Sequence, residues 1–214
     1  MTEIKKEVLQ FLQTYHVHIV GFGSVPDDIT VLEIEKFPRA IVFGILLSKS
    51  VLETVTDRPS LIYKHHYKTV NWILDQTAFH LAQFIEKKGT KAIAIPASQT
   101  IDWQNQRGHI SHKILAQAAG LGYIGRSGLL VHPTYGAQVR YVSILTDLHF
   151  EPDTPLDLDC GTCTKCINLC PAHAVTEHGV DIHRCYEKLR EFSRIRGIGQ
   201  HICGVCVKAC NGRN

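Results

Sequence analysis

The distribution of cysteines constrains this chain more than any other feature of its sequence. All eight cysteines come after the first 159 residues of the 214-residue chain. The first run places two, two and three residues between Cys160, Cys163, Cys166 and Cys170, and ends with Pro171. This is the spacing of bacterial ferredoxins, in which cysteine thiolates hold 4Fe–4S clusters. The run therefore predicts an iron–sulfur site.

A second run repeats the end of the first. Cys203, Cys206 and Cys210 have the same spacing as the last three cysteines of the first run, and no proline follows, because Asn211 stands there. Cys185 lies 18 residues before Cys203 and supplies the thiolate that this run lacks. Together the two runs predict ligands for two clusters, with no cysteine left over.

The fourth cysteine of a ferredoxin run ligates the other cluster of the pair. Applying this crossover gives two sets of four ligands. The first cysteine set is Cys160, Cys163, Cys166 and Cys210. The second cysteine set is Cys170, Cys185, Cys203 and Cys206.

Two other interpretations of the cysteines are weaker. Structural zinc also uses paired Cys-x-x-Cys motifs, but zinc sites rarely combine this triple spacing with a fourth cysteine and a proline. A disulfide framework is typical of secreted proteins, whereas the first residues have no signal-peptide pattern.

Composition excludes several classes of protein. The net charge of +3 is too small to argue for nucleic-acid binding, and the 44% hydrophobic content is ordinary for a globular chain. No apolar run approaches the roughly 18 residues that span a bilayer, so we expect no membrane segment. We expect the protein to be cytoplasmic.

Apolar periodicity predicts the elements before the cysteines. Helices are predicted at residues 3–15, 59–88 and 111–119, the second being long enough for a break; strands are predicted at 18–25, 39–47, 91–95, 129–132 and 138–145. Pro152 and Pro155, among acidic residues, indicate a hinge. We therefore predict two domains, a cofactor-binding core at 1–151 and a cluster module at 152–214.

A glycine-rich segment before the hinge is the second informative stretch. Gly120, Gly122, Gly125 and Gly128 fall within nine residues, and such density lets a backbone approach a flat group or another backbone closely. A dinucleotide-binding loop is disfavoured, because that fingerprint follows a strand and opens a helix, whereas this one follows a predicted helix. Tight turns between packed elements remain the main alternative.

This glycine-rich segment, the strand end Thr146-Asp147-Leu148 and the double-cluster module together resemble epoxyqueuosine reductases and reductive dehalogenases. The resemblance is strong from about Lys113 to Cys210 and weaker before it. It implies an α+β fold, with a nitroreductase-like α/β core followed by a ferredoxin-like module carrying two 4Fe–4S clusters. It also implies that the core binds base-off cobalamin. By position, the candidate cobalamin contacts are Gly120, Gly122, Gly125, Arg126, Ser127 and Gly128.

The chain also departs from these families. Epoxyqueuosine reductases usually carry an acidic proton donor before the glycine-rich loop, where this chain has Gln106-Arg107-Gly108-His109, and Asp102 is out of register. The chain ends four residues after Cys210, without the helical-repeat extension of many tRNA-acting members. We therefore expect tRNA to be an unlikely partner, and the resemblance does not identify a small-molecule substrate.

Histidine is a plausible proton donor, because its unperturbed pKa is near 6.5. His109 and His112 lie just before the glycine-rich segment and are the candidate catalytic residues. A group of basic residues follows Arg184, and it would either attract an acidic ferredoxin or flavodoxin as electron donor or compensate the charge of the clusters.

The leading prediction is an oxidoreductase that passes single electrons through two clusters to a corrinoid for a reductive reaction. The alternatives are an electron-transfer protein, or a protein that reduces the corrinoid of another protein, without substrate chemistry of its own. A flavin could also replace cobalamin.

Overall fold

In the computed structural model, which describes residues 3–17 and 19–212, four predicted strands pair in one sheet in the order β1-β2-β6-β3. They are β1 (Ile19–Ser24), β2 (Arg39–Leu46), β3 (Ala92–Ile95) and β6 (Val139–Thr146). β1 is antiparallel to β2, and β3 is antiparallel to β6. The four strand predictions are confirmed within two residues at each end, although the predicted start at His18 lies outside the described residues.

The three predicted helices are also present. They are α1 (Glu3–Gln13), α3 (Leu61–Glu86) and α4 (His112–Ala118). α3 runs for 26 residues without the break that its length made conceivable. Among the residues that the structure describes, no helix combines the length and the apolar character that a bilayer crossing requires.

The chain divides into two units that alternate along the sequence. Unit 1 comprises Met1–Ile45, Asn71–Gly122 and Arg140–Leu156, and unit 2 comprises Leu46–Val70, Tyr123–Val139 and Asp157–Asn214. The chain crosses from unit 1 to unit 2 for the last time after Leu156, close to the predicted domain boundary at 151. Of the four earlier boundaries, three divide β2, α3 and β6 and one falls just before β4 (Tyr123–Ile124), and no composition change in the sequence marks them. The assignment of a separate function to 1–151 and 152–214 stays a prediction.

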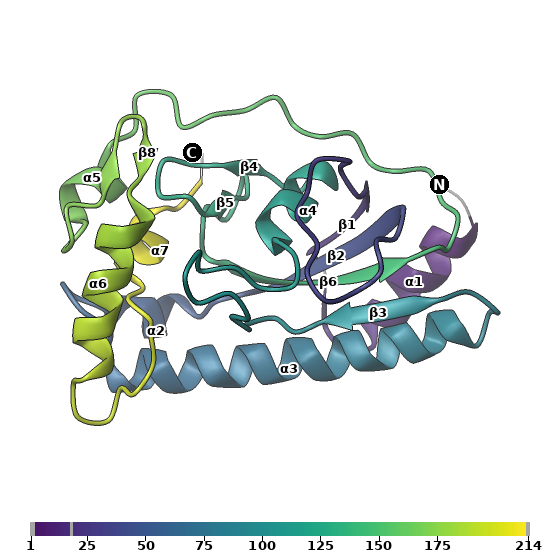
Figure 1. Cartoon of the computed structure of the whole chain (residues 1–214), viewed down its shortest axis with the longest axis horizontal. Helices are drawn as coiled ribbons and strands as arrows, with labels where there is room; N and C mark the ends of the chain where they lie inside the picture. Colours follow the sequence, from purple (N-terminus) through teal and green to yellow (C-terminus); the bar gives the residue numbers. More distant parts are fainter. Residues whose placement is uncertain (1–2, 18, 213–214) are drawn as a thin grey trace. The chain divides into compact units, whose positions relative to one another are not determined.

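In unit 1, helices lie on both faces of the sheet (Figure 1). Nε of Arg140 on β6 donates to Asn71 Oδ1 on α3 at 2.8 Å. Ser143, three residues later on the same strand, is hydrogen bonded to His112 of α4. Because successive side chains of a strand point to opposite faces, these two contacts place α3 and α4 on opposite sides of β6.

Two glycines of β1 let α4 lie close to the sheet. A Cβ atom on Gly21 would come within 2.5 Å of the Ala119 carbonyl oxygen, and one on Gly23 within 3.1 Å of the Ala119 nitrogen. The missing side chains therefore allow the end of α4 to rest directly on the β1 backbone, which sets the position of the glycine-rich segment that follows.

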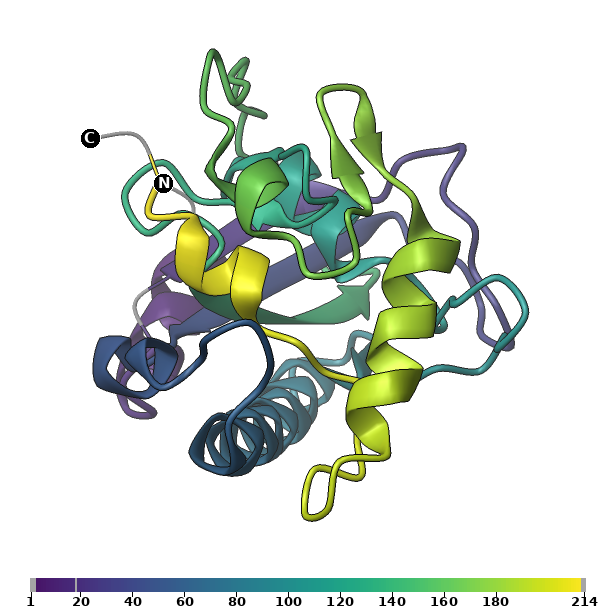
Figure 2. The same ribbon diagram turned by 90° about the vertical axis from the view of Figure 1, so that its left-hand side faces the viewer.

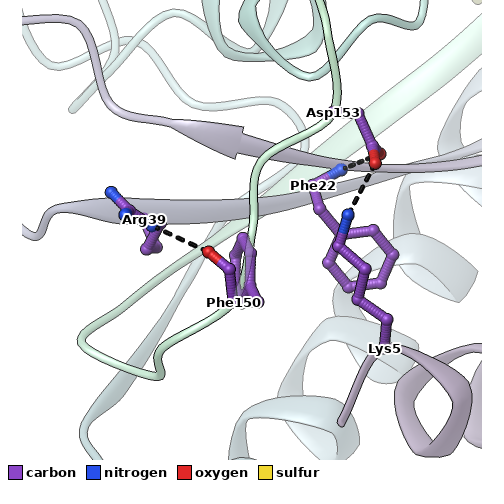
Figure 3. A network of polar contacts seen from close by, with 5 residues as sticks. All are labelled: Lys5, Phe22, Arg39, Phe150 and Asp153. Atoms are coloured by element: carbon purple, nitrogen blue, oxygen red, sulfur yellow. Dashed lines mark hydrogen bonds and ion pairs between the residues drawn. The ribbon is translucent and has the colours of Figure 1, made fainter. Parts of the chain in front are cut away.

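Within unit 1, a partly buried ion pair attaches the segment after β6 to α1 (Figure 3). Asp153 accepts hydrogen bonds from Lys5 Nζ at 2.6 Å and from the Phe22 backbone N–H at 2.9 Å. Nearby, Arg39 Nε donates to the Phe150 carbonyl oxygen at 3.2 Å. The region predicted as a hinge is thus attached to β1 and β2 as far as Asp153.

Unit 2 contains short elements, most of which the sequence did not predict. They are α2 (Lys49–Glu53), the hairpin β4–β5 (Tyr123–Ile124 and Leu130–Val131), α5 (Lys165–Leu169), the hairpin β7–β8 (Val175–Thr176 and Gly179–Val180), α6 (Ile182–Ser193) and α7 (Val205–Ala209). The strand predicted at 129–132 corresponds to β5. α5 and α7 pack against one another (Figure 2). This contact brings the two cysteine runs together.

Candidate metal centre

The two cysteine runs fold into matching local structures. In the first run, α5 carries Cys166 and ends at Cys170; in the second, α7 carries Cys206 and ends at Cys210. Both terminal cysteines have extended backbone conformations. The repeated spacing seen in the sequence therefore corresponds to a repeated turn and helix.

The backbone hydrogen bonds of the two runs also correspond. The Asn168 N–H donates to the Thr164 carbonyl at 3.2 Å, and the Lys208 N–H donates to the Gly204 carbonyl at 2.9 Å. Both donors lie two residues before the last cysteine of their run. Gly204 adopts a φ of +89°, a left-handed conformation that glycine reaches without steric cost.

The thiols of the first cysteine set lie close enough to influence one another. The pKa of the Cys166 thiol is raised, first by its burial and then by the neighbouring Cys160, Cys210 and Cys163. These are the other three members of the predicted set. Cys210 therefore lies near the first run, which supports the crossover of the ferredoxin pattern, and the assignment of the four ligands stays a prediction.

The second cysteine set shows the same mutual influence. Burial, together with Cys185 and Cys170, raises the pKa of Cys203 to about 11. Burial, together with Cys203, Cys185, Cys170 and then Cys166, raises the pKa of Cys206 to about 12. Cys185, which no motif fixes locally, is thus brought to the second run by α6.

These thiols suit an iron–sulfur cluster. Because burial raises the pKa of Cys203 to about 11 and that of Cys206 to about 12, these two thiols are protonated at neutral pH without metal, and binding of iron would displace their protons. Cys170 Sγ already accepts a hydrogen bond from the Ala174 N–H at 3.4 Å, the kind of contact that tunes cluster potentials. Across residues 3–17 and 19–212, no three side chains of His, Cys, Asp or Glu converge as ligands of a single metal ion.

The exposure of the eight cysteines is uneven. Cys163 of the first set is exposed, and the other seven cysteines are partly buried. Within the loop from Cys160 to Cys163, residues 161–163 are exposed to solvent.

Gly120 has a structural role at the end of α4. Its N–H donates to the Gln117 carbonyl, and the Leu121 N–H donates to the Ala116 carbonyl, both at 3.0 Å. With a φ of +70° at Gly120, this is the Schellman arrangement that ends many helices. A Cβ atom there would also meet the Thr154 carbonyl oxygen at 2.6 Å.

Gly125, Arg126 and Gly128 lie in the turn between β4 and β5, and the turn faces the metal centre. A Cβ atom on Gly125 would come within 3.2 Å of Cys160 Sγ, and one on Gly128 within 2.7 Å of Val180 Cγ1. The guanidinium group of Arg126 donates to the backbone carbonyls of Gly161 and Cys163.

The six predicted cobalamin contacts therefore fall into two groups, four with contacts to protein atoms and two without a described structural role. At Gly120, Gly125 and Gly128 the space beside the α-carbon is filled by protein atoms, and Arg126 binds the cysteine loop. These contacts favour structural roles for the four residues. Gly122 is buried and Ser127 is partly exposed. The assignment of all six residues to a corrinoid stays a prediction.

The two candidate catalytic histidines are both hydrogen bonded within unit 1. His112 Nε2 donates to the Pro96 carbonyl at 2.9 Å, which leaves Nδ1 to accept from the Ser143 hydroxyl at 2.8 Å. Burial lowers the pKa of His112 to about 4, with a smaller contribution from the positive charge of Arg140. A neutral ring with both nitrogens engaged favours a structural role for His112.

His109 keeps more freedom. Its Nδ1 donates to the Leu32 carbonyl at 3.1 Å. In the opposite direction, the Leu32 backbone N–H donates to the His109 carbonyl. Its role as a proton donor stays a prediction. Asp102, the carboxylate in the same loop, accepts from Asn105 Nδ2 at 2.7 Å, and the hydrogen bonds from Asn105 hold its pKa below the usual value.

One polar group in unit 1 escaped the sequence analysis. The hydroxyl of Tyr141 on β6 is buried, and within the described part of the chain it has no hydrogen-bond partner. Burial raises its pKa. Buried hydroxyls are usually paired with protein atoms or ordered water, so Tyr141 is a candidate partner for a group or a water bound in unit 1. A tyrosine in an apolar strand gives no sequence signal for such a role.

The comparisons with known proteins identify related reductases, while no protein-family model matches the chain. The epoxyqueuosine reductase of Staphylococcus aureus strain NCTC 8325 is 35% identical over 95% of this chain and 57% of its own length. That of Bacillus subtilis strain 168 is 31% identical over 48% of this chain and 29% of its own length. The chain thus spans well under two thirds of these relatives.

Solved structures support the fold. A reductive dehalogenase described as B12-dependent superimposes with a TM-score of 0.76 at 19% identity, covering 97% of this chain and 31% of its own. An epoxyqueuosine reductase bound to a modified tRNA-Tyr stem loop gives a TM-score of 0.68 at 20% identity, covering 97% of this chain and 64% of its own. The predicted α+β fold with a nitroreductase-like core is confirmed, and so is the resemblance to both families.

One expectation is wrong. We expected tRNA to be an unlikely partner, but the curated homologues are epoxyqueuosine reductases, and a solved one holds a tRNA stem loop. The relatives extend beyond the region that this chain matches, so the point at which the sequence ends does not decide the substrate.

Proposed function

We propose that this chain is the cofactor-bearing core of a cobalamin-dependent reductase that receives electrons through two 4Fe–4S clusters. The observation that carries the proposal is the influence of Cys160, Cys163 and Cys210 on the Cys166 thiol, and of Cys170 and Cys185 on the thiols of Cys203 and Cys206. Homology to epoxyqueuosine reductases over 95% of the chain supports it.

The clusters supply the electron path. Cys160, Cys163, Cys166 and Cys210 would hold one cluster, and the second cysteine set would hold the other. The influence of Cys166 on the Cys206 thiol indicates that the two sets are neighbours, as a two-cluster relay requires. Each cluster transfers single electrons, over a potential range of about −700 to +450 mV that its surroundings set.

Cobalamin is proposed on homology and on the unpartnered hydroxyl of Tyr141. When bound, it would supply the reductive chemistry, and the protein would supply position and protons. We assign Tyr141 in unit 1 as a candidate hydrogen-bond partner of the bound group. Gly122 and Ser127 remain candidate contacts from the glycine-rich segment.

The substrate that homology favours is epoxyqueuosine in tRNA. The 35% identity to an epoxyqueuosine reductase runs along nearly the whole chain, whereas the similarity to dehalogenases lies at the level of the fold. His109 is the proposed proton donor. Its ring makes one hydrogen bond to the backbone, and in the sequence it lies in the segment where epoxyqueuosine reductases usually carry their acidic proton donor.

A second candidate function has its own support. Asp102 and His112, two groups near the glycine-rich segment that could donate a proton, are both held in hydrogen bonds that oppose this role. A protein that reduces a corrinoid, or passes electrons on, needs no such donor. The second candidate is therefore an electron-transfer or corrinoid-reducing protein.

Anaerobic reconstitution distinguishes these functions. The protein is loaded with iron and sulfide and then titrated with hydroxocobalamin, while its absorption spectrum is followed. It is next reduced and mixed with tRNA that contains epoxyqueuosine. Corrinoid binding with conversion to queuosine supports the reductase. Binding without conversion, together with reduction of an added corrinoid, supports the second candidate. A folded protein with two clusters that binds no corrinoid excludes the proposed reductase.

A further inference from the structure

Arg126 makes three hydrogen bonds, all to backbone carbonyl oxygens of unit 2. Nη2 donates to Gly161 at 2.8 Å, Nη1 donates to Cys163 at 3.0 Å, and Nε donates to Glu177 at 3.3 Å. Two of these carbonyls belong to the first cysteine run. The third lies in the turn of the β7–β8 hairpin. One side chain therefore joins three segments.

The turn that carries Arg126 is itself held against the same loop. The Gly125 N–H donates to the Leu129 carbonyl at 2.9 Å, and the Gly128 N–H donates to the Gly125 carbonyl at 2.8 Å, which closes the turn. Gly125 lies against Cys160 Sγ, and Gly128 lies against Val180 of the hairpin. The absence of side chains at both glycines brings the turn close enough for Arg126 to reach the carbonyls.

The loop that Arg126 binds is short and irregular, and Arg126 adds to the hydrogen bonds that the Cys163 N–H donates to the Cys160 carbonyl and the Gly161 N–H donates to Asp159. This loop contains Cys163, the exposed member of the first cysteine set, and Gly161, whose φ of +51° is left-handed. The loop contains no regular helix or strand between Cys160 and Thr164. The planar guanidinium group offers five donors in a fixed geometry, which suits carbonyls from different directions. A lysine ammonium would keep the charge without this geometry.

The charge of Arg126 has a second consequence. A cluster bound by four thiolates is anionic and becomes more so on reduction, and its potential depends on local charge and hydrogen bonds. A permanent positive charge beside the loop favours the reduced form. It therefore raises the reduction potential of the nearby cluster relative to that of the cluster held by the second set.

We infer that Arg126 is a positioning residue of the first cluster, which fixes the Cys160–Cys163 loop and raises the potential of that cluster selectively. The inference rests on the cluster assignment of the proposed function. It also gives part of the glycine-rich segment a task in the iron–sulfur centre, where the sequence suggested a contact with the corrin.

The test compares two variants. Arg126→Gln removes both the positive charge and the planar guanidinium group, whereas Arg126→Lys keeps only the positive charge. Arg190→Gln is the matched control, because Arg190 is exposed on α6, the helix that carries Cys185 of the second set. Potentials of both clusters are measured by anaerobic titration followed by electron paramagnetic resonance. A Cys163→Ser variant identifies the signal of the first cluster. Iron release to a chelator is measured in parallel.

In Arg126→Gln we expect the reduction equilibrium of the first cluster to shift at least tenfold toward the oxidised form, about 59 mV for one electron. The second cluster should keep its potential. In Arg126→Lys the potential should stay nearer the wild-type value, while iron release becomes several-fold faster. Loss of the first cluster alone from Arg126→Gln would also support the positioning role.

Three results would overturn the inference. These are equal shifts of both clusters, loss of all iron from Arg126→Gln, and unchanged potentials with unchanged iron release. Failure of the wild-type protein to hold two clusters would instead contradict the proposed function, so the two failures are distinguishable.

Discussion

Lys5 Nζ lies 2.6 Å from Asp153 Oδ1, and this ion pair joins α1 to the segment that follows β6 (Figure 3). The Lys5 side chain is 10% exposed and that of Asp153 is 40% exposed. Lys5 Nζ also lies 4.9 Å from the centre of the Phe22 ring. The pair therefore holds together residues that are distant in sequence but share the environment of β1.

Asp153→Ala should destabilise the protein by about 2–3 kcal/mol, less than the loss of one partner from a fully buried pair, because Asp153 is partly solvated. The substitution leaves a buried ammonium group and an unpaired Phe22 N–H. Lys5→Met combined with Asp153→Asn should recover most of the loss, since the amide oxygen can accept from Phe22. Urea denaturation under anaerobic conditions measures both. If the double variant is no more stable than Asp153→Ala, the pair does not act as described.

The two cysteine sets predict selective loss of iron. Cys185→Ala should leave the cluster of the first set in place, and Cys163→Ala should leave that of the second set. Each variant is therefore expected to fall from about eight irons per chain to about four, because a 4Fe–4S cluster normally requires four cysteine ligands. Iron and sulfide analysis with electron paramagnetic resonance checks this. Zinc in place of iron in the wild-type protein would contradict the assignment.

Gly136 predicts a backbone constraint on the same centre. Its φ is +60°, and a Cβ atom there would clash with the Cys210 carbonyl oxygen. Gly136→Ala should therefore displace Cys210 and reduce the iron content to about four.

Gly89→Ala is the matched control for this substitution. Gly89 has a φ of +83°, and a Cβ atom there would meet nothing within 4 Å. Only the left-handed conformation opposes the substitution, at a cost of roughly 1–2 kcal/mol. It should retain all the iron that the wild-type protein holds. Equal iron content in the two variants would show that the contact between Gly136 and Cys210 is unimportant.

The sequence allowed the four sheet strands and α3 to be predicted because each depends on a local pattern, and the cysteine sets, which stay a prediction, were assigned from spacing in the same way. Apolar periodicity marks a strand or helix, and the separations of cysteines limit which thiols can share a cluster. The end of the helix predicted at 111–119 places Gly120 at its C-terminus, but the sequence analysis assigned Gly120 to a corrinoid and not to this structural role.

The role of Arg126 could not be predicted in this way. Its partners Gly161, Cys163 and Glu177 are 35, 37 and 51 residues away and contribute only backbone carbonyls, which carry no sequence signal. α6 was also missed, although Asp181 caps it by accepting from the Arg184 N–H. The sequence analysis treated Cys185 in this segment as a cluster ligand and did not consider the helical periodicity of the residues around it.

His112 predicts a dependence of stability on pH. Its pKa in the folded protein is about 4, below the value near 6.5 expected in the unfolded chain. Between these values the unfolded chain binds a proton that the folded protein does not. Stability therefore falls as the pH decreases from 6.5 toward 4, and it is unaffected by this group above 7. The full effect is about 2–3 kcal/mol, since the residue retains partial exposure.

His112→Gln removes the titration but keeps both hydrogen bonds, because the amide nitrogen can donate to Pro96 and the amide oxygen can accept from Ser143. His66→Gln is the comparison, since burial also lowers the pKa of His66, but to a smaller extent. Thermal unfolding is followed by circular dichroism under anaerobic conditions at pH 5, 6, 7 and 8. Each kcal/mol corresponds to roughly 2–4 °C in a chain of this size. Relative to wild type, His112→Gln should lose several degrees less between pH 7 and pH 5. The same loss in wild type and His112→Gln would mean that the ring is protonated in the folded protein, and the structural role assigned to His112 would then fail.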